Sequence, residues 1–236
     1  GECIELYGNE GDRPMEKIER KRLVIYLLGM VCVSLGIVFC AQCGVGTWPI
    51  SGIPFVLKEI LPLTFGQLTM LFHFVNIGFQ MTLLKKVRDG KILLQIPVAF
   101  LFGWLIDFLK RFVTIDQECL LMQFFALGLS IFFTALGMVM MVRMDLVQNP
   151  PDGFVKLAAE IFKKEFGSVK VLYDVVCVIF TLSIGMVCLK QPYGMGIATI
   201  ASALLVGRTV SLINKIVPPK AVTARFHMKN EDHGRK

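Results

Sequence analysis

The chain has 236 residues, of which 55% are hydrophobic and 18% are charged, and its mean hydropathy is +0.65. A charged fraction below the usual quarter excludes an ordinary soluble domain and indicates a multi-pass membrane protein. The net charge of +7 does not by itself require a nucleic acid or another acidic partner, because basic loops also orient proteins in membranes.

Six apolar segments are predicted to be transmembrane helices. The first is about 31 Å long as a helix, which is enough to cross the hydrocarbon core, and it lacks the small-residue cleavage pattern of a signal peptide. Pro97 is expected to kink the third segment. In chain order the predicted spans are 23–43, 67–84, 92–113, 120–142, 169–189 and 195–217.

Two turns interrupt this pattern. The turn at 47–52 contains Pro49, and the turn at 148–153 contains Pro150, 101 positions later. Proline has no N–H and disfavours the α conformation of the residue before it, so an apolar helix is expected to stop at each turn. The segments that follow, 53–61 and 154–166, are predicted to re-enter the membrane, lie at its interface or plug a cavity.

The distribution of Lys and Arg predicts the orientation of the six spans. With the N-terminus in the cytoplasm, 20 basic residues lie in cytoplasmic segments and four lie outside, while Arg208 falls within a span. This bias follows the positive-inside rule and places both termini in the cytoplasm. The predicted organisation is a cytoplasmic segment 1–22, membrane repeat A at 23–113, membrane repeat B at 118–217 and a cytoplasmic tail 218–236. Residues before Met15 are left out of the fold prediction.

The two halves of the chain form an internal repeat. Shifting the chain by 101 positions aligns 34–79 with 135–180 without a gap, and a shift of 104 positions extends the match to the third span of each half. The most informative coincidences are Gly36/Gly137, Pro49/Pro150, Gly52/Gly153, Glu59/Glu160, Phe65/Phe166, Gly66/Gly167 and Gly103/Gly207.

An odd number of spans in each half forces the second copy to enter the membrane from the opposite side. The sequence therefore predicts an all-α membrane protein of six helices arranged as two inverted three-helix repeats, with a broken or interfacial short helix after spans one and four. Inverted repeats with paired broken helices are typical of secondary transporters. A duplicated scaffold that transports nothing is the alternative, because a fold does not fix a function.

Several short motifs resemble the YczE/YyaS/YitT-type bacterial integral membrane proteins. They are the Gly-Thr-x-Pro turn at 46–49, the Phe-Gly pair at 65–66, and Gly-Met-Gly-Ile-Ala-Thr at 194–199 followed by Leu-Val-Gly at 205–207. The resemblance covers about 23–217 and implies a bacterial inner-membrane protein whose activity is largely unassigned. The acidic residue that follows the proline is present as Asp152, whereas Ser51 takes its place in the first half. The resemblance therefore does not support a symmetric pair of carboxylates.

Polar residues at the breaks and within the spans are the candidate site residues, since polar groups in a bilayer are costly. Asp152 has two interpretations, as an N-cap of the following helix or as a coupling-ion ligand. The other intramembrane groups are either an ion path or polar side chains satisfied by structural pairing, such as Asp107 with Arg208, or either of them with Arg143 or Asp145. The predicted substrate-binding residues are Thr47, Trp48, Ser51, Gln148, Asn149 and Asp152, and the predicted ion or proton path comprises His73, Asp174, Asp107, Arg208 and Asp145.

Other kinds of chemistry have little support in the sequence. Cys40 and Cys43 have the spacing of a thiol-redox pair, although cysteines three positions apart on a helix are more often packing neighbours. No metal site, catalytic residue or cofactor is predicted. The expected partners are the lipid bilayer and an unidentified small molecule or ion, with no nucleic acid, and a homo-oligomer is compatible with the sequence.

The sequence thus favours a non-enzymatic carrier of a small solute in the cell membrane. A regulatory or assembly partner that transports nothing is the second interpretation, and a membrane thiol-redox enzyme is the third.

Overall fold

The computed structural model describes residues 20–84, 90–115 and 118–216. Every regular element in these ranges is helical, which confirms the all-α prediction. The predicted cytoplasmic start, the basic cluster at 85–88 and the predicted tail lie outside the described residues. In chain order the elements are α2 (Arg20–Gln42), α3 (Pro49–Leu57), α4 (Phe65–Leu84), α5 (Gly90–Leu93), α6 (Gln95–Lys110), α7 (Leu120–Met144), α8 (Pro150–Ile161), α9 (Phe166–Ile184), the π-helical turn η1 (Gly185–Leu189) and α10 (Ile197–Ile216).

Four of these helices are long and apolar enough to cross a membrane: α2, α7, α9 with η1, and α10. α4 and α6 correspond to the other two predicted spans and differ from these four. α4 has 20 residues but carries His73, Asn76 and Gln80, and α6 has only 16 residues. The structure therefore describes a helical protein with several apolar helices that could span a membrane.

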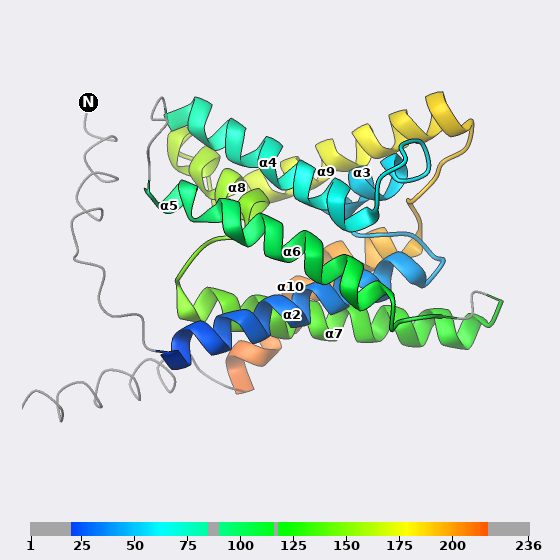
Figure 1. Ribbon diagram of the computed structural model, residues 1–236, viewed down its shortest axis with the longest axis horizontal. Coiled ribbons are helices and arrows are strands. Elements are labelled where there is room, and N and C mark those ends of the chain that lie inside the picture. The colour runs from blue at the N-terminus through cyan, green and yellow to red at the C-terminus, as the bar shows by residue number, and fades with distance from the viewer. Residues whose placement is uncertain (1–19, 85–89, 116–117, 217–236) are drawn as a thin grey trace, which may run out of the picture.

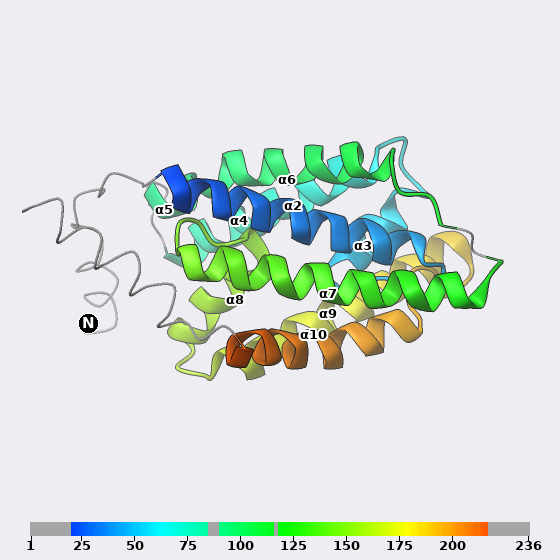
Figure 2. The ribbon, with the colours of Figure 1, turned by 90° about the horizontal axis from the view of Figure 1, so that it is seen from below.

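Helices α2 and α7 run antiparallel and form the closest helix pair (Figure 2). Their backbones approach at glycines, which leave room because they have no side chain. A Cβ atom on Gly36 would overlap Thr134 Oγ1, and one on Gly137 would lie 2.7 Å from Val33 Cγ2. Around this crossing, buried side chains of α2, α6 and α7 build the main apolar core, which includes Met30, Val38, Phe102, Ile106 and Met141.

Figure 1 shows the bundle as two layers. Helices α3, α4, α8 and α9 lie in one layer, α2, α7 and α10 lie in the other, and α6 bridges them from α4 to α2. The two short helices lie at opposite ends of the long axis, with α8 at the left of the view and α3 at the right. α3 packs against α9, and α8 packs against α4.

The predicted boundaries of the short helices are wrong. α3 begins at Pro49 and α8 begins at Pro150, four positions earlier than the predicted segments. Each proline occupies the first helical turn, where no N–H is needed and its fixed φ already suits a helix. α8 ends at Ile161 because the chain turns at Lys163, whose φ is 51°. The segment 154–166 therefore comprises the last two thirds of α8, a turn and the first residue of α9.

The third predicted span is interrupted near the predicted kink. α5 ends at Leu93 and α6 begins at Gln95. Pro97 offers no N–H to the carbonyl of Leu93, four positions earlier, and its ring crowds that carbonyl. Proline therefore separates one helical turn from the rest of the span.

Candidate functional site

The first break is held by the glycine-rich loop that precedes α10. The Thr47 N–H donates to Gly194 O at 2.9 Å, and the Ala198 N–H donates to Val45 O at 2.9 Å. Thr199 Oγ1 then donates to Thr47 O at 2.7 Å. The two glycine motifs that carry the family resemblance thus contact one another across the two halves of the chain.

The predicted ligand residues of this break are buried or hydrogen-bonded within the protein. Thr47 is 1% exposed and Ser51 is 6% exposed. Trp48 is half-buried, and its Nε1 donates to Ser130 Oγ at 3.1 Å, which in turn donates to Gly36 O at 2.7 Å. The hydrogen bond of Trp48 thus ties the turn to α7 and, through Ser130, to α2, while Thr47 is held by Gly194 and Thr199 and Ser51 is buried in α3.

The second break presents polar groups at the start of α8. Gln148 is exposed, and Asn149 is the half-buried residue just before Pro150. Its Oδ1 atom is buried and has no hydrogen-bond partner. Asp152 is in the first turn of α8, as its third residue. The N-cap interpretation of Asp152 is therefore wrong, because the cap position belongs to Asn149.

Asp152 belongs to a cluster of three charges between α8 and α9. Lys170 Nζ lies 3.2 Å from Asp152 Oδ1 and 3.4 Å from Asp174 Oδ1. The three side chains are between 22% and 29% exposed. Because the two carboxylates share one ammonium group, the cluster carries one negative charge in excess when all three groups are ionised.

Polar groups of α4 extend this cluster. Tyr173, adjacent to Asp174, donates from Oη to Asn76 Oδ1 at 2.7 Å. His73, one turn before Asn76, is 3% exposed and packs against the ring of Phe102, and its Nδ1 has no hydrogen-bond partner. The predicted positions His73 and Asp174 therefore lie on facing helices, joined through Tyr173 and Asn76.

A pair of glutamines completes the contact between α4 and α8. Gln80 and Gln95 exchange amide hydrogen bonds of 2.8 Å and 3.0 Å, and Gln80 Nε2 also donates to Pro150 O at 3.0 Å. This network satisfies a carbonyl at the start of α8 inside the bundle. Together with the charge cluster it forms a polar seam through α4, α8 and α9.

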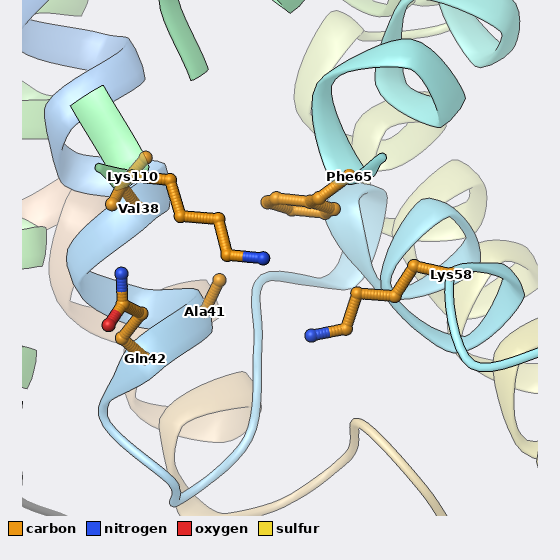
Figure 3. A pocket seen from close by; sticks show the side chains of 6 residues that line it. All are labelled: Val38, Ala41, Gln42, Lys58, Phe65 and Lys110. Carbon is orange, nitrogen blue, oxygen red and sulfur yellow. The ribbon is translucent and has the colours of Figure 1, made fainter. Parts of the chain in front are cut away.

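A second polar feature is a cavity of about 200 Å³ beside α3, at the other end of the bundle. Figure 3 shows Lys58 and Lys110 pointing their ammonium groups toward each other across it. Lys58 follows α3 and Lys110 ends α6. Apolar groups and one amide form the remaining wall, which comprises Val38, Ala41, Gln42 and Phe65.

One carboxylate lies beside this cavity. Glu59 Oε1 accepts from Tyr193 Oη at 3.0 Å and lies 3.4 Å from Lys58 Nζ. Burial lowers the pKa of Lys58 below the usual lysine value, the charge of Glu59 opposes that shift, and the charge of Lys110 adds to it. Burial and Glu59 raise the pKa of Tyr193 to about 12. The two cations thus repel one another across the space they share.

The other predicted path residues lie apart from the seam. Asp107 accepts hydrogen bonds from Thr64 Oγ1 and from the Gly66 N–H, and so it holds the start of α4. Arg208 is exposed on α10, and Asp145 is exposed at the end of α7 with a φ of 47°. Asp107 thus bonds to groups at the start of its neighbouring helix α4, and Arg208 lies exposed on α10.

The cysteine pair has a local packing geometry. Cys40 and Cys43 are both fully buried, and Cys43 Sγ donates to Cys40 O at 3.0 Å. Both thiols are free. They form part of a small apolar cluster with Ala126, Leu127 and Ala198.

Several residues of these two sites were not predicted from the sequence, namely Lys170, Asn76, Gln80, Gln95 and the two cavity lysines. The signal was present on α4, because His73, Asn76 and Gln80 are spaced three and four positions apart and share one helical face. Lys170 and Asp174 are also four apart. Lys58 and Lys110 were used only to predict orientation, and no local pattern links two residues 52 positions apart.

Comparison with known proteins agrees with the resemblance found in the motifs. The chain is 25% identical over 199 residues to the uncharacterized protein YyaS of Bacillus subtilis (strain 168), and the match covers 83% of this chain and 94% of YyaS. No solved structure matches the chain significantly. Residues 20–215 match the model of DUF6198, a family of unknown function. The YyaS-like resemblance is thereby confirmed, and the chain belongs to the DUF6198 family.

Proposed function

We propose that the protein is a secondary transporter that carries a small solute across the cytoplasmic membrane by alternating access. Its six spans are α2, α4, α5 with α6, α7, α9 with η1, and α10, arranged as two inverted three-helix repeats with both termini in the cytoplasm. Four of these helices meet the length and hydropathy of a span on their own. α4 and α6 carry more polar groups or are shorter because they lie at the polar seam and at the Pro97 break.

Pairs of equivalent contacts support the proposed repeat: a contact between the two halves recurs when each residue is replaced by its repeat partner. At the α2 and α7 crossing, Gly36 meets Thr134, and Gly137 meets Val33. Residues 36 and 137, like residues 33 and 134, are 101 positions apart. The second contact is therefore the first with the halves exchanged, as expected for a pseudo-two-fold axis.

The short helices α3 and α8 also make equivalent contacts in the two halves. A Cβ atom on Gly52 of α3 would lie 2.7 Å from Thr181 Oγ1 on α9, and one on Gly153 of α8 would lie 2.9 Å from Gln80 Oε1 on α4. Thr181 and Gln80 are again 101 positions apart. Because α3 and α8 lie at opposite ends of the bundle (Figure 1), an axis that exchanges them favours an inverted repeat.

One departure from this symmetry carries the proposal of alternating access. In the first half, α4 and α6 pack backbone to backbone: a Cβ atom on Gly66 would overlap Gly103 O, and one on Gly103 would lie 2.6 Å from Gly66 O. The repeat partners of these glycines are Gly167 on α9 and Gly207 on α10. A Cβ atom on either of them would meet nothing within 4 Å, and α9 does not pack along α10 as α4 packs along α6.

A carrier that alternates between two conformations is expected to have one half closed and the other open in each of them. The close contact of α4 with α6 and the separation of α9 from α10 fit this expectation. Gly207 lies in the interior of α10, where glycine costs about 0.5–1 kcal/mol relative to alanine, and no contact in this conformation requires a glycine there. If α9 closes on α10 while α4 separates from α6, Gly167 and Gly207 take over the contact that Gly66 and Gly103 make here. Such an exchange of conformations between halves interchanges access from the two sides of the membrane.

The charge cluster is the candidate coupling site of this carrier. Asp152 belongs to the short helix, whereas Lys170 and Asp174 belong to a span, so the ion pairs of Lys170 join two elements that would move relative to one another. Charged groups inside membrane proteins commonly mark ion or proton pathways. A proton or cation bound by Asp152 would weaken its pairing with Lys170 and loosen the contact between α8 and α9.

Cross-linking tests the proposed exchange without a known cargo. Cysteines at positions 167 and 207 of the protein in proteoliposomes are expected to form a disulfide on oxidation, and peptide mass spectrometry identifies the bridge despite the native cysteines. A pair at positions 78 and 128, glycines that also have nothing within 4 Å of a Cβ, is the control and should remain unlinked. Absence of the 167–207 bridge under conditions that give other surface disulfides would contradict the proposal.

The second candidate function is a membrane scaffold or regulatory partner. The open face of α9 favours it, since large apolar side chains there are exposed, including Val171, Leu172, Ile179 and Phe180. A scaffold predicts that another chain covers the exposed apolar face of α9 and that α9 does not close on α10. Bridges between positions 167 of two copies, in place of the 167–207 bridge within one copy, would favour this second function.

A further inference from the structure

We infer that the cavity between Lys58 and Lys110 binds a small oxyanion, a carboxylate or phosphate group, through both ammonium groups. The two side chains come from different helices and enter the cavity from opposite sides (Figure 3). Lysine acts as a compact point charge with three donors and binds phosphate groups in this way.

The local balance of charge favours an anion. Lys58 forms an ion pair with Glu59, and the same carboxylate accepts a hydrogen bond from Tyr193. Asp107, three residues before Lys110, is engaged by Thr64 and Gly66. In the part of the chain that the structure describes, Lys110 forms no ion pair. Two lysines line the cavity itself, and no carboxylate is among its lining residues, so an anion between the two ammonium groups would reduce their repulsion.

The walls of the cavity limit the size of the ligand. Its volume of about 200 Å³ is below the roughly 300–1,000 Å³ of pockets that hold drug-sized ligands. The apolar wall from Val38, Ala41 and Phe65 excludes water from one side, which strengthens the attraction between the anion and the lysines. Gln42 also lines the cavity, and its Nε2 donates to Val113 O at 2.6 Å. The site therefore suits an anion of a few heavy atoms, or the charged end of a larger one.

The shared ligand chemistry has two sources, a free solute and the phosphate of a phospholipid. Binding itself is independent of the proposed transport. Only the further step, that this anion is the cargo, depends on the proposed function. In that case the cavity is the entry site on the side of the membrane where α3 lies, and the carrier is selective for small organic or inorganic anions.

Direct binding to the purified full chain in an uncharged detergent tests the inference. Isothermal titration with acetate and with inorganic phosphate is expected to show saturable binding by the native protein. Lys58→Gln with Lys110→Gln should weaken this binding at least about tenfold. Lys58→Arg should retain it, because the charge is kept. Lys156→Gln is the matched control, since it removes one charge from an exposed position on α8.

Two outcomes support the inference and two overturn it. Lysine-dependent binding of acetate or phosphate identifies a free solute. Lysine-dependent binding of phosphatidylglycerol but not of the zwitterionic phosphatidylcholine, measured by native mass spectrometry, identifies the unpaired phosphate of an anionic phospholipid. Absence of all binding, or equal binding by the double variant and the native protein, overturns the site. If the protein binds anions but forms no 167–207 bridge, the anion site is supported and the proposed transport function is contradicted.

Discussion

Lys170 of α9 places its ammonium nitrogen 3.2 Å from Asp152 Oδ1 on α8. The same nitrogen contacts Asp174 one turn further along α9, so one cation links a short helix to a long one. Asp152 lies three positions after Asn149, where the chain leaves the second break. A change of charge at this cluster therefore acts directly on the contact between α8 and α9.

Removing this cation is expected to destabilise the fold. Lys170→Met leaves two carboxylates close together and without a counterion in a partly buried position. Loss of one partner of a fully buried ion pair costs about 3–5 kcal/mol, and the partial exposure of these groups reduces our expectation to roughly 1–3 kcal/mol. The measurement is the free energy of unfolding of the purified protein in detergent.

A second substitution separates charge from packing. Adding Asp152→Asn to Lys170→Met removes one of the orphaned carboxylates and should recover part of the lost stability. Lys156→Met, on the exposed side of α8, should change the free energy of unfolding by less than about 0.5 kcal/mol. Asp152→Asn is also measured alone, to complete a double-mutant cycle. If it lowers the free energy of unfolding equally in the native protein and in Lys170→Met, the two groups are not coupled and the ion pair has no energetic role.

The α2 and α7 crossing predicts opposite effects for two glycines. Gly36→Ala should destabilise the protein by about 1–3 kcal/mol, because the new methyl group would overlap Thr134 Oγ1 and lie 2.8 Å from Ser130 O. Gly128→Ala, on the partner helix α7, meets nothing within 4 Å and should be neutral or stabilising by up to about 1 kcal/mol. Thermal unfolding in one detergent compares them, and equal effects would show that the helices do not cross as described.

The sequence predicted the long helices well, because each is a continuous apolar run. It predicted the two breaks but not where the short helices start, since Pro49 and Pro150 both end a turn and open a helix. The link of Lys170 to Asp174 is local and could have been found from spacing. The links of Tyr173 to Asn76 and of Lys58 to Lys110 depend on how distant helices meet, which no local periodicity specifies.

Binding of acetate at the lysine cavity is expected to weaken as pH rises. The protonated ammonium of Lys58 holds the anion, and its pKa lies below the usual lysine value because of burial and the charge of Lys110. Affinity should therefore fall within a pH range in which an exposed lysine stays charged. Tyr193, with a pKa of about 12, stays neutral there. The sign is opposite for stability, because the unfolded chain binds the proton more tightly and the fold gains stability as pH rises through this range.

Titration calorimetry with acetate at a series of pH values checks this expectation, since acetate keeps its charge from neutral to alkaline pH. Lys58→Arg should hold its affinity to higher pH, because a guanidinium does not deprotonate there. Lys156→Gln controls for general charge effects. An affinity for acetate that stays constant up to the usual pKa of lysine would show that Lys58 does not hold the anion.

The open glycine Gly207 allows a test that separates stability from conformational exchange. Gly207→Leu adds a side chain where nothing lies within 4 Å of a Cβ, so the conformation described here should keep its stability or gain slightly from the better helix former. The same side chain would prevent α10 from approaching α9 as closely as α6 approaches α4. The reporter is a protein with cysteines at positions 167 and 211, which measures cross-linking between α9 and α10. In this protein we expect Gly207→Leu to reduce cross-linking at least about tenfold. Gly128→Leu on α7 is the control and should leave cross-linking unchanged. A protein that becomes less stable with Gly207→Leu would instead indicate that α10 already packs closely at this position, and unchanged cross-linking would show that the glycine is not needed for closure.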